Sequence, residues 1–241
     1  MAKFTVTLAK REEIASGTWA FSFGLGAHPF TFKPGQAMDL FLVHPKHPDP
    51  RGPQHPFTIA GTAGPNTIQI ATRIRDSVYK KNLLEMPLGG ELEVDGPWGE
   101  FTIPDGATDI VMLAGGIGVT PFRAIAQDAT ARSLPLDLSL IHSNRTPEET
   151  PFIAELKRWT TANNRFTYLP TMTQMEHSQA PWVGARRRID AAFLDEALDD
   201  NRSAALYMVA GPPRFVDGVS AALGEVGVPA ARILLDKFDG Y

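Results

Sequence analysis

The stretch from residue 113 to 121 contains the residues whose types and spacing point most directly to chemistry. It combines three glycines with a threonine and a proline: Gly115, Gly116, Gly118, Thr120 and Pro121. The apolar run 110–114 predicts a buried parallel strand, and Thr120 and Pro121 predict the N-cap and first position of a helix. Such a strand–turn–helix junction suits a pyrophosphate, because free amide groups and the helix dipole attract the anion. A tight turn with a purely structural role has the same pattern.

A second group of polar residues follows another apolar run, at 136–141. Ser143, Asn144 and Arg145 offer a hydroxyl, an amide and a guanidinium group in place of a carboxylate. These donors suit a 2′-phosphate, so the sequence favours NADPH over NADH. The alternative is that Arg145 pairs in solvent with a nearby glutamate, Glu148 or Glu149.

A third strand–turn–helix junction occurs at Gly211, Pro212 and Pro213. Ligands bind beyond the carboxyl ends of parallel strands, so all three junctions are expected at one crevice. The basic run 186–188 is expected to be a solvated surface, with two alternatives: contact with the 2′-phosphate, or docking of an acidic electron carrier.

The first half of the chain contains a segment suited to a planar heteroaromatic ligand. His55 offers a hydrogen-bonding ring, Pro56 follows it, Phe57 offers a flat apolar face and Thr58 a hydroxyl group. The alternative is a loop that enters a strand, with Phe57 in the core and His55 in solvent.

Another segment, at 72–77, ends a strand and begins a helix. Ser77 and nearby amide groups could hold a phosphate, with charge from Arg73 or Arg75. Ser77 or Asp76 as an ordinary helix cap explains the pattern equally well. Farther along the chain, Trp98 is either core filler or a ligand wall.

The elements that position these residues change in character along the chain. From residue 3 to about 94, apolar residues alternate with polar ones between turns rich in Pro and Gly, which predicts an antiparallel β-barrel with one short helix at 79–86, its buried side formed by Val78, Leu83 and Leu84. Later, apolar strands at 110–114, 136–141, 166–169, 206–210 and 233–235 alternate with helices expected from Pro121, Pro147, Asp190 and Pro213. The predicted architecture is therefore a barrel domain, 1–104, followed by an α/β parallel-sheet nucleotide-binding domain, 105–241.

Composition excludes several classes of protein. A net charge of −4 gives no electrostatic reason to expect nucleic acid or an anionic membrane as partner. With no cysteine, the chain has no disulfide, cysteine nucleophile or cysteine-ligated cluster, and no metal site is expected from the six scattered histidines. No apolar run approaches a membrane span and no secretory leader is apparent, so a cytoplasmic location is expected.

Taken in order, these motifs resemble those of the ferredoxin–NADP⁺ reductase superfamily, and the resemblance covers almost the whole chain. The segment 55–58 is similar to the family's Arg-x-Tyr-Ser/Thr flavin motif, in the His-Pro-Phe-Thr form of ferric reductases and NADPH oxidases, with His55 in place of arginine. Positions of the flavin ribose and pyrophosphate match Thr72, Arg73, Ile74 and Ser77. The glycine turn at 115–121 matches the nicotinamide-nucleotide motif.

The resemblance implies an FAD enzyme that takes hydride from NADPH, with NADH as the alternative donor, and passes electrons to a separate protein or small-molecule acceptor such as a ferredoxin or flavodoxin. It implies that Phe238 or Tyr241 covers the flavin and that Thr58 and Asp236 are proton-relay candidates. The same resemblance allows other hypotheses: a free-flavin or ferric reductase, an electron-transfer subunit of a multicomponent oxygenase, and a redox sensor that binds a nucleotide without catalysing a reaction.

Overall fold

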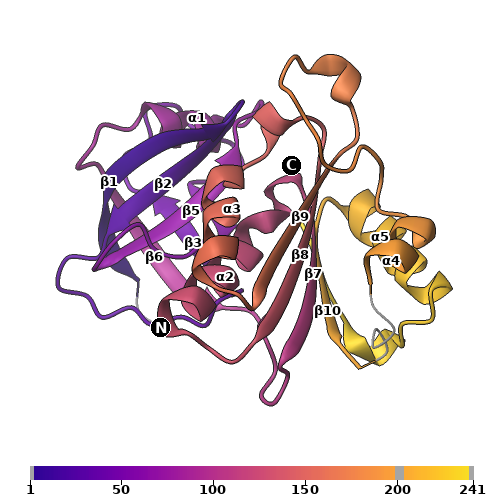
Figure 1. Ribbon diagram of the computed structural model, residues 1–241. Helices are drawn as coiled ribbons and strands as arrows, with labels where there is room; N and C mark the ends of the chain where they lie inside the picture. The colour runs from indigo at the N-terminus through magenta and orange to yellow at the C-terminus, as the bar shows by residue number, and fades with distance from the viewer. Residues whose placement is uncertain (1–2, 199–203, 239–241) are drawn as a thin grey trace.

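The computed structural model describes residues 3–198 and 204–238 of the 241-residue chain. It contains two β-sheets of different kinds, and Figure 1 shows helices α2 and α3 lying between them. The predicted fold class, an antiparallel barrel followed by a parallel α/β sheet, is confirmed.

The first sheet has six antiparallel strands in the order β4-β3-β6-β1-β2-β5. They are β1 (Phe4–Ala15), β2 (Thr18–Gly24), β3 (Ala37–Leu42), β4 (Gln54–Thr58), β5 (Thr67–Arg73) and β6 (Glu91–Trp98). Just beyond β4, the Ala60 N–H donates to the Gln69 carbonyl at 2.8 Å and the Gln69 N–H to the Gly61 carbonyl at 2.9 Å. The two ends of the sheet meet there, so the sheet curves into a barrel.

Alternating apolar residues fill the interior of this barrel, because successive side chains of a strand point to opposite faces. The inward-facing set includes Val6, Leu8, Phe21, Phe23, Met38, Leu40, Ile68, Ile70, Leu92 and Val94. The period-two pattern of the sequence therefore predicted the core of this domain.

Helix α1 (Val78–Glu85) packs against the barrel core. Its fully buried residues are Tyr79, Lys80, Asn82 and Leu83. Of the residues expected on the buried side, Leu83 is buried and Leu84 packs against the same core, whereas Val78 is half-buried and does not belong to that cluster. Tyr79 takes the inner position because its ring joins the core while its O–H donates to the Leu40 carbonyl at 3.0 Å.

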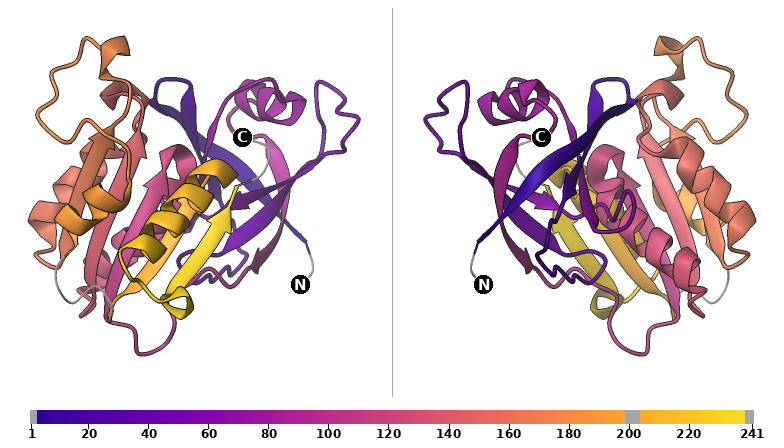
Figure 2. Two further views of the ribbon diagram at one scale, coloured as in Figure 1. Left: turned by 90° about the vertical axis from the view of Figure 1, so that its right-hand side faces the viewer. Right: turned by 90° about the vertical axis from the view of Figure 1, so that its left-hand side faces the viewer.

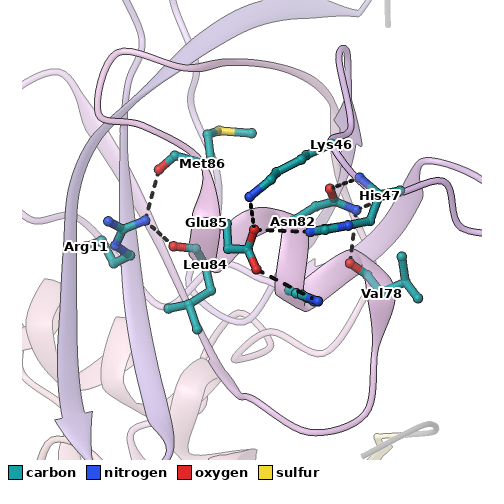
Figure 3. Close-up of polar contacts among 9 residues, drawn as sticks. Arg11, Lys46, His47, Val78, Asn82, Leu84, Glu85 and Met86 are labelled. Atoms are coloured by element: carbon teal, nitrogen blue, oxygen red, sulfur yellow. Dashed lines mark hydrogen bonds and ion pairs between the residues drawn. The ribbon is translucent and has the colours of Figure 1, made fainter.

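Polar side chains fasten the loop at 43–53 to α1 (Figure 3). Asn82 exchanges two hydrogen bonds with the backbone of His47, at 2.7 and 2.8 Å. Glu85 accepts from Lys46 at 2.7 Å and contacts His47 at 3.1 Å, and these partners lower the pKa of Glu85 to about 2. Arg11 donates to carbonyl groups at the C-terminal end of the helix. The loop that leads into β4 is thereby held in place.

The second sheet has five parallel strands in the order β11-β10-β7-β8-β9. They are β7 (Asp109–Gly115), β8 (Asp137–Asn144), β9 (Phe166–Met172), β10 (Leu206–Gly211) and β11 (Ile233–Lys237). Because β7 lies in the middle, its side chains are buried on both faces, with Met112 in one core and Leu113 in the other.

Two helices cover each face of this sheet. One face is covered by α2 (Thr120–Arg132) and α3 (Ile153–Ala162), the other by α4 (Ala191–Ala197) and α5 (Pro213–Glu225). Two predicted helix starts are wrong. The N-cap of α2 is Val119, because a 3-10 turn at Gly116–Val119 comes first and makes Thr120 the first helical residue. Helix α3 begins at Ile153 rather than near Pro147, where only a 3-10 turn forms.

Helix α2 also joins the second sheet to the barrel. Arg123, which is 3% exposed, binds Glu155 through two nitrogens at 2.8 and 2.9 Å and donates to the Ala60 carbonyl of the barrel at 2.6 Å. Gln127 exchanges two hydrogen bonds with the backbone of Thr62, both at 2.9 Å. Figure 2 shows the resulting arrangement from two opposite sides, with β11 in yellow running toward the barrel. These contacts fix the interface between the two sheets, called here the seam.

The chain passes from one sheet to the other between β6 and β7, so we propose the domain boundary near residues 104 and 105. Within the described part of the chain, no helix has the length and apolar character needed to cross a membrane.

Candidate functional site

The carboxyl ends of four parallel strands form one cleft against the barrel, called here the strand-end cleft. It is lined by Thr18, Arg73, Arg75, Gly115, Gly116, Ile117, Ser143, Asn144, Arg145, Glu149, Pro151, Thr173, Pro212 and Phe215. All three junctions singled out in the sequence contribute to it. The expected crevice at the strand ends is therefore present.

The glycines of this cleft are required by close backbone approach. A side chain at Gly118 would begin 2.3 Å from the Ala210 carbonyl oxygen, and one at Gly115 would meet the Phe215 ring at 2.6 Å. Gly116 has φ +54° and Gly211 has φ +151°, which L side chains rarely adopt. The turn thus brings the ends of β7 and β10 together.

The neighbours of the glycines complete the turn. The Thr120 hydroxyl donates to the Ile117 carbonyl at 3.2 Å, and Pro121 is buried at the start of α2. Pro213 begins α5. These residues shape the helix starts and lie behind the cleft surface.

Positive charge prevails in the strand-end cleft. Arg73, Arg75 and Arg145 line it, while the carboxylate of Glu149 is already paired with Arg73 at 2.5 Å. Arg145 is exposed and has no ion pair among the described residues, so the expected alternative of a pair with Glu148 or Glu149 is absent there. The cleft therefore suits an anion.

Asn144 adds an unused donor. It is 7% exposed, and its side-chain Nδ2 has no hydrogen-bond partner within the described chain. The main-chain carbonyl oxygen of Asn144 accepts hydrogen bonds from the backbone N–H and the hydroxyl of Thr173, at 2.9 and 3.1 Å. This buried amide donor is therefore available to a partner from outside the described chain.

A second cleft, called here the barrel cleft, lies between β4 and the end of β11. It is lined by Gly35, Ala37, His55, Pro56, Phe57, Thr58, Trp98, Gly99, Glu100, Phe101, Asp236, Lys237 and Phe238. Three distant parts of the sequence meet here: the segment 55–58, the turn at Trp98 and the aromatic residue Phe238.

His55 and Phe57 stack on one another, with ring centroids 4.6 Å apart and an interplanar angle of 22°. Phe57 is 2% exposed and belongs to the barrel core, so the flat apolar face expected of it is largely covered. His55 is half-buried, its Nδ1 donates to the Pro56 carbonyl at 2.8 Å, and burial lowers its pKa. Thr58 is half-buried at the end of β4. The ring available to the cleft is therefore that of the histidine.

The opposite walls of the barrel cleft are aromatic and acidic. Trp98 is 43% exposed and its Nε1 donates to Asp39 at 3.1 Å, which holds the indole as a wall rather than as core filler. Phe238 is 8% exposed, and burial raises the pKa of Asp236. Tyr241, the other expected aromatic cover, lies outside the described residues.

The two clefts are neighbours on one seam. The Phe238 N–H, from the barrel cleft, donates to the Gly211 carbonyl at 2.9 Å. Gly211 in turn lies against Gly115 of the glycine turn and precedes Pro212, which lines the strand-end cleft. Ligands bound in the two clefts would approach one another at this strand end.

Some predicted site residues lie apart from the clefts. Thr72 is fully buried in β5 with no partner for its hydroxyl among the described residues, and Ile74 packs against the barrel core. Ser77 caps α1, accepting the Lys80 N–H at 3.3 Å. In the basic run 186–188, Arg187 is paired with Glu196 at 3.0 Å.

Two buried residues near the clefts were missed by sequence reasoning. Lys80 donates to the Arg73 carbonyl at 3.3 Å, and desolvation, with Arg75 and Arg51 nearby, lowers its pKa to about 8. His142 lies beneath the glycine turn. The available signal was a lysine and a histidine at positions where the helix and strand patterns require a buried residue.

Comparisons with known proteins agree with this geometry. Residues 112–221 match the model of the oxidoreductase NAD-binding domain. The chain is 29% identical over 213 residues to the glycine betaine monooxygenase reductase subunit of Chromohalobacter salexigens, covering 87% of this chain and 56% of that protein. It is 27% identical over 217 residues to the reductase component of propane 2-monooxygenase from Rhodococcus jostii, with the same coverages. The chain thus spans about half the length of these curated relatives.

A solved structure matches nearly end to end. The ferredoxin NADP⁺ reductase of Neisseria gonorrhoeae, determined with bound FAD and NADP, superposes with a TM-score of 0.79 at 20% identity, covering 98% of this chain and 99% of that one. The specific likeness of 55–58 to ferric reductases and NADPH oxidases stays a prediction. The chain therefore has the two-domain fold of this ferredoxin NADP⁺ reductase over nearly its whole length, and its second half matches the oxidoreductase NAD-binding domain.

Proposed function

We propose that this protein is an FAD-dependent reductase that takes hydride from NADPH and passes electrons to a separate acceptor. The observation that carries the proposal is the meeting of the two clefts at the Gly211–Phe238 hydrogen bond, 2.9 Å long. Hydride transfer requires the two reacting rings in contact, and neighbouring clefts joined at this hydrogen bond would provide that proximity.

The barrel cleft fits a flavin ring. His55 and Thr58 on one side and Trp98 and Phe238 on the other would bind its faces and edge. When bound, a flavin accepts a hydride and releases electrons singly, which is the chemistry that the protein itself lacks. Asp236, whose pKa is raised by burial, and Thr58 would exchange protons at this cleft.

The basic groups at the start of α1 favour FAD over a flavin with a single phosphate. Lys80, Arg75 and Arg51 are close enough for their charges to interact, and Lys80 and Arg51 also affect His55. Their combined positive charge would attract the pyrophosphate of FAD, while Ser77 contributes through the helix start that it caps.

The strand-end cleft fits a nicotinamide dinucleotide. The turn at Gly115, Gly116 and Gly118 would bind its pyrophosphate, and the unpartnered Asn144 amide with Arg145 would bind a 2′-phosphate. The prevailing positive charge supports NADPH as the preferred donor.

The names of the relatives guide the proposal for the acceptor. Two relatives are named as the reductase subunit or reductase component of a monooxygenase, so we propose a protein electron carrier or an oxygenase component as the acceptor. A cytoplasmic location belongs to the same proposal.

The test is an oxidation assay with NADPH and NADH in parallel, with ferricyanide as artificial acceptor and the flavin content read from the visible spectrum. The expected result is a yellow protein that retains flavin through gel filtration, is bleached anaerobically by NADPH and turns over faster with NADPH. A folded protein that binds no flavin would overturn the proposal. Bound flavin without turnover would identify a sensor, and flavin lost on the column would identify a free-flavin reductase.

A further inference from the structure

His142 lies directly beneath the glycine turn and is fully buried. Its Nε2 is 2.8 Å from the Gly116 carbonyl oxygen, and its Nδ1 is 3.1 Å from the hydroxyl oxygen of Tyr168. The histidine comes from β8 and the tyrosine from β9, so two neighbouring strands support the turn that follows β7. Neither His142 nor Tyr168 is among the residues that line the strand-end cleft.

The contacts determine where the ring proton lies. A carbonyl oxygen only accepts, so Nε2 carries the hydrogen and donates it to Gly116. Nδ1 is then an acceptor and receives the Tyr168 O–H. Burial lowers the pKa of His142 to about 4, so the ring stays neutral with this one N–H at neutral pH.

The direction of the Gly116 carbonyl fixes the next amide group. In a trans peptide the carbonyl and the following N–H point in opposite directions. Because the Gly116 carbonyl points inward to His142, the Ile117 N–H points away from it, toward the side where Gly116 and Ile117 line the strand-end cleft. As a first-turn amide it has no acceptor within its own helix.

We propose that His142, held in the Nε2–H form by Tyr168, is a positioning residue that orients the Gly116–Ile117 peptide so that its N–H binds the pyrophosphate of the nicotinamide dinucleotide. This inference rests on the proposed function, because it concerns the same cleft. In this role the buried pair of His142 and Tyr168 holds a backbone N–H in the direction of the anion before the anion binds. Without the pair, the peptide would be free to turn its N–H away.

The test compares His142→Leu, His142→Gln and Tyr168→Phe with the wild type. NADP⁺ binding is measured by calorimetry, and KM and kcat for NADPH in the ferricyanide assay. His142→Leu leaves the Gly116 carbonyl unsatisfied, and we expect the dissociation constant and KM to rise about tenfold, with kcat at saturation and flavin content nearly unchanged. The glutamine Nε2 lies near the position of the histidine Nε2, so His142→Gln is expected to restore most of the affinity. Tyr168→Phe frees the tautomer and should give a rise of roughly threefold.

Ser22→Ala is the matched control, because it removes a buried hydrogen bond, Gln69 to Ser22 at 3.0 Å, from the barrel. It should lower thermal stability without moving KM. Wild-type protein that binds no NADP⁺ would refute the proposed function itself. Wild-type protein that binds, together with His142→Leu binding within twofold of it, would refute the positioning role alone. Where His142→Leu does not fold, an affinity of Tyr168→Phe equal to that of the wild type refutes it.

Discussion

In the strand-end cleft the decisive groups belong to the backbone, whereas in the barrel cleft they are side chains. Gly118 lies so close to β10 that even a methyl group would meet a carbonyl oxygen, and the groups offered to the pyrophosphate of a ligand are amides at a helix start. In the barrel cleft, His55 stacks on Phe57 and Trp98 is tethered to Asp39. A site whose binding groups are backbone amides requires glycines, because side chains would prevent the close approach of the main chain. A site whose binding groups are side chains depends on how those side chains pack against their neighbours.

This difference predicts different responses to mutation. A backbone-built site fails when a Cβ is added, because the main chain on both sides must shift. A site built from side chains loses one interaction at a time, because each wall is held by its own partner. The seam at Gly211 and Phe238 belongs to both, since its hydrogen bond joins the two clefts.

The sharpest test of the comparison is Gly118→Ala. Its Cβ would lie 2.3 Å from the Ala210 carbonyl oxygen, so the turn must move away from β10. We expect a loss of about 3 kcal/mol in the free energy of unfolding, as for overpacked cores, and NADP⁺ binding weakened at least tenfold. Urea unfolding and calorimetry measure the two effects.

Gly218→Ala is the control for this substitution. Gly218 lies within α5, where an added Cβ meets no atom within 4 Å. Alanine should stabilise the helix by about 0.5–1 kcal/mol and leave NADP⁺ binding unchanged. Similar losses in both variants would mean that the close approach at Gly118 is unimportant.

The next effect concerns Lys80, the buried cation near the barrel cleft. In the folded chain its pKa is lowered from 10.5 to about 8 by desolvation, Arg75 and Arg51. Between these pH values Lys80 binds more protons in the unfolded chain, so its contribution to the stability of the flavin-free protein should rise as pH increases from about 8 to 10.5. Lys80→Met should abolish that rise and weaken FAD binding about tenfold, because a cation near the pyrophosphate is lost.

Chemical denaturation at a series of pH values, with fluorescence titration of FAD, checks both outcomes. Lys81→Met is the matched control, since Lys81 is the next residue of α1 and is exposed. A stability curve of Lys80→Met that still climbs above pH 8 would contradict the assignment.

Arg145 tests the choice of coenzyme in the strand-end cleft. It is exposed at the end of β8, so its loss removes charge without disturbing the turn. Arg145→Ala should raise KM for NADPH about fivefold and leave KM for NADH within twofold, because only NADPH carries the 2′-phosphate. Arg188→Ala, an exposed arginine outside the lining of either cleft, should change neither value. Equal effects on both coenzymes would show that Arg145 binds another part of the dinucleotide.

The same contrast explains how much could be predicted from the sequence. Strands and the glycine turn were predictable, because period-two patterns and closely spaced glycines are local consequences of backbone geometry. Helix starts were less predictable from the sequence. Phe152 has φ +60°, so α3 begins after it and not near Pro147 as expected. Lys80 and His142 were missed because their importance depends on what packs against them from distant segments. Phe57 was suggested both as a ligand wall and as a core residue, and only the packed barrel places its ring beneath His55.

The smallest expected effect concerns Glu149, the carboxylate of the strand-end cleft. It pairs with Arg73 at 2.5 Å across the seam, and both side chains are partly exposed, so Glu149→Gln should cost less than about 1 kcal/mol of stability. The same change removes the negative charge of the carboxylate that lines the cleft and releases Arg73. KM for NADPH should therefore fall about twofold at low salt, and the difference should vanish at high salt as the charges are screened.

Glu148→Gln is the control, because Glu148 is bound to Ser178 at 2.8 Å outside the cleft lining. A rise in KM in Glu149→Gln would mean that the ion pair positions Arg73 for the ligand, and side-chain packing would then matter in the backbone-built cleft as well.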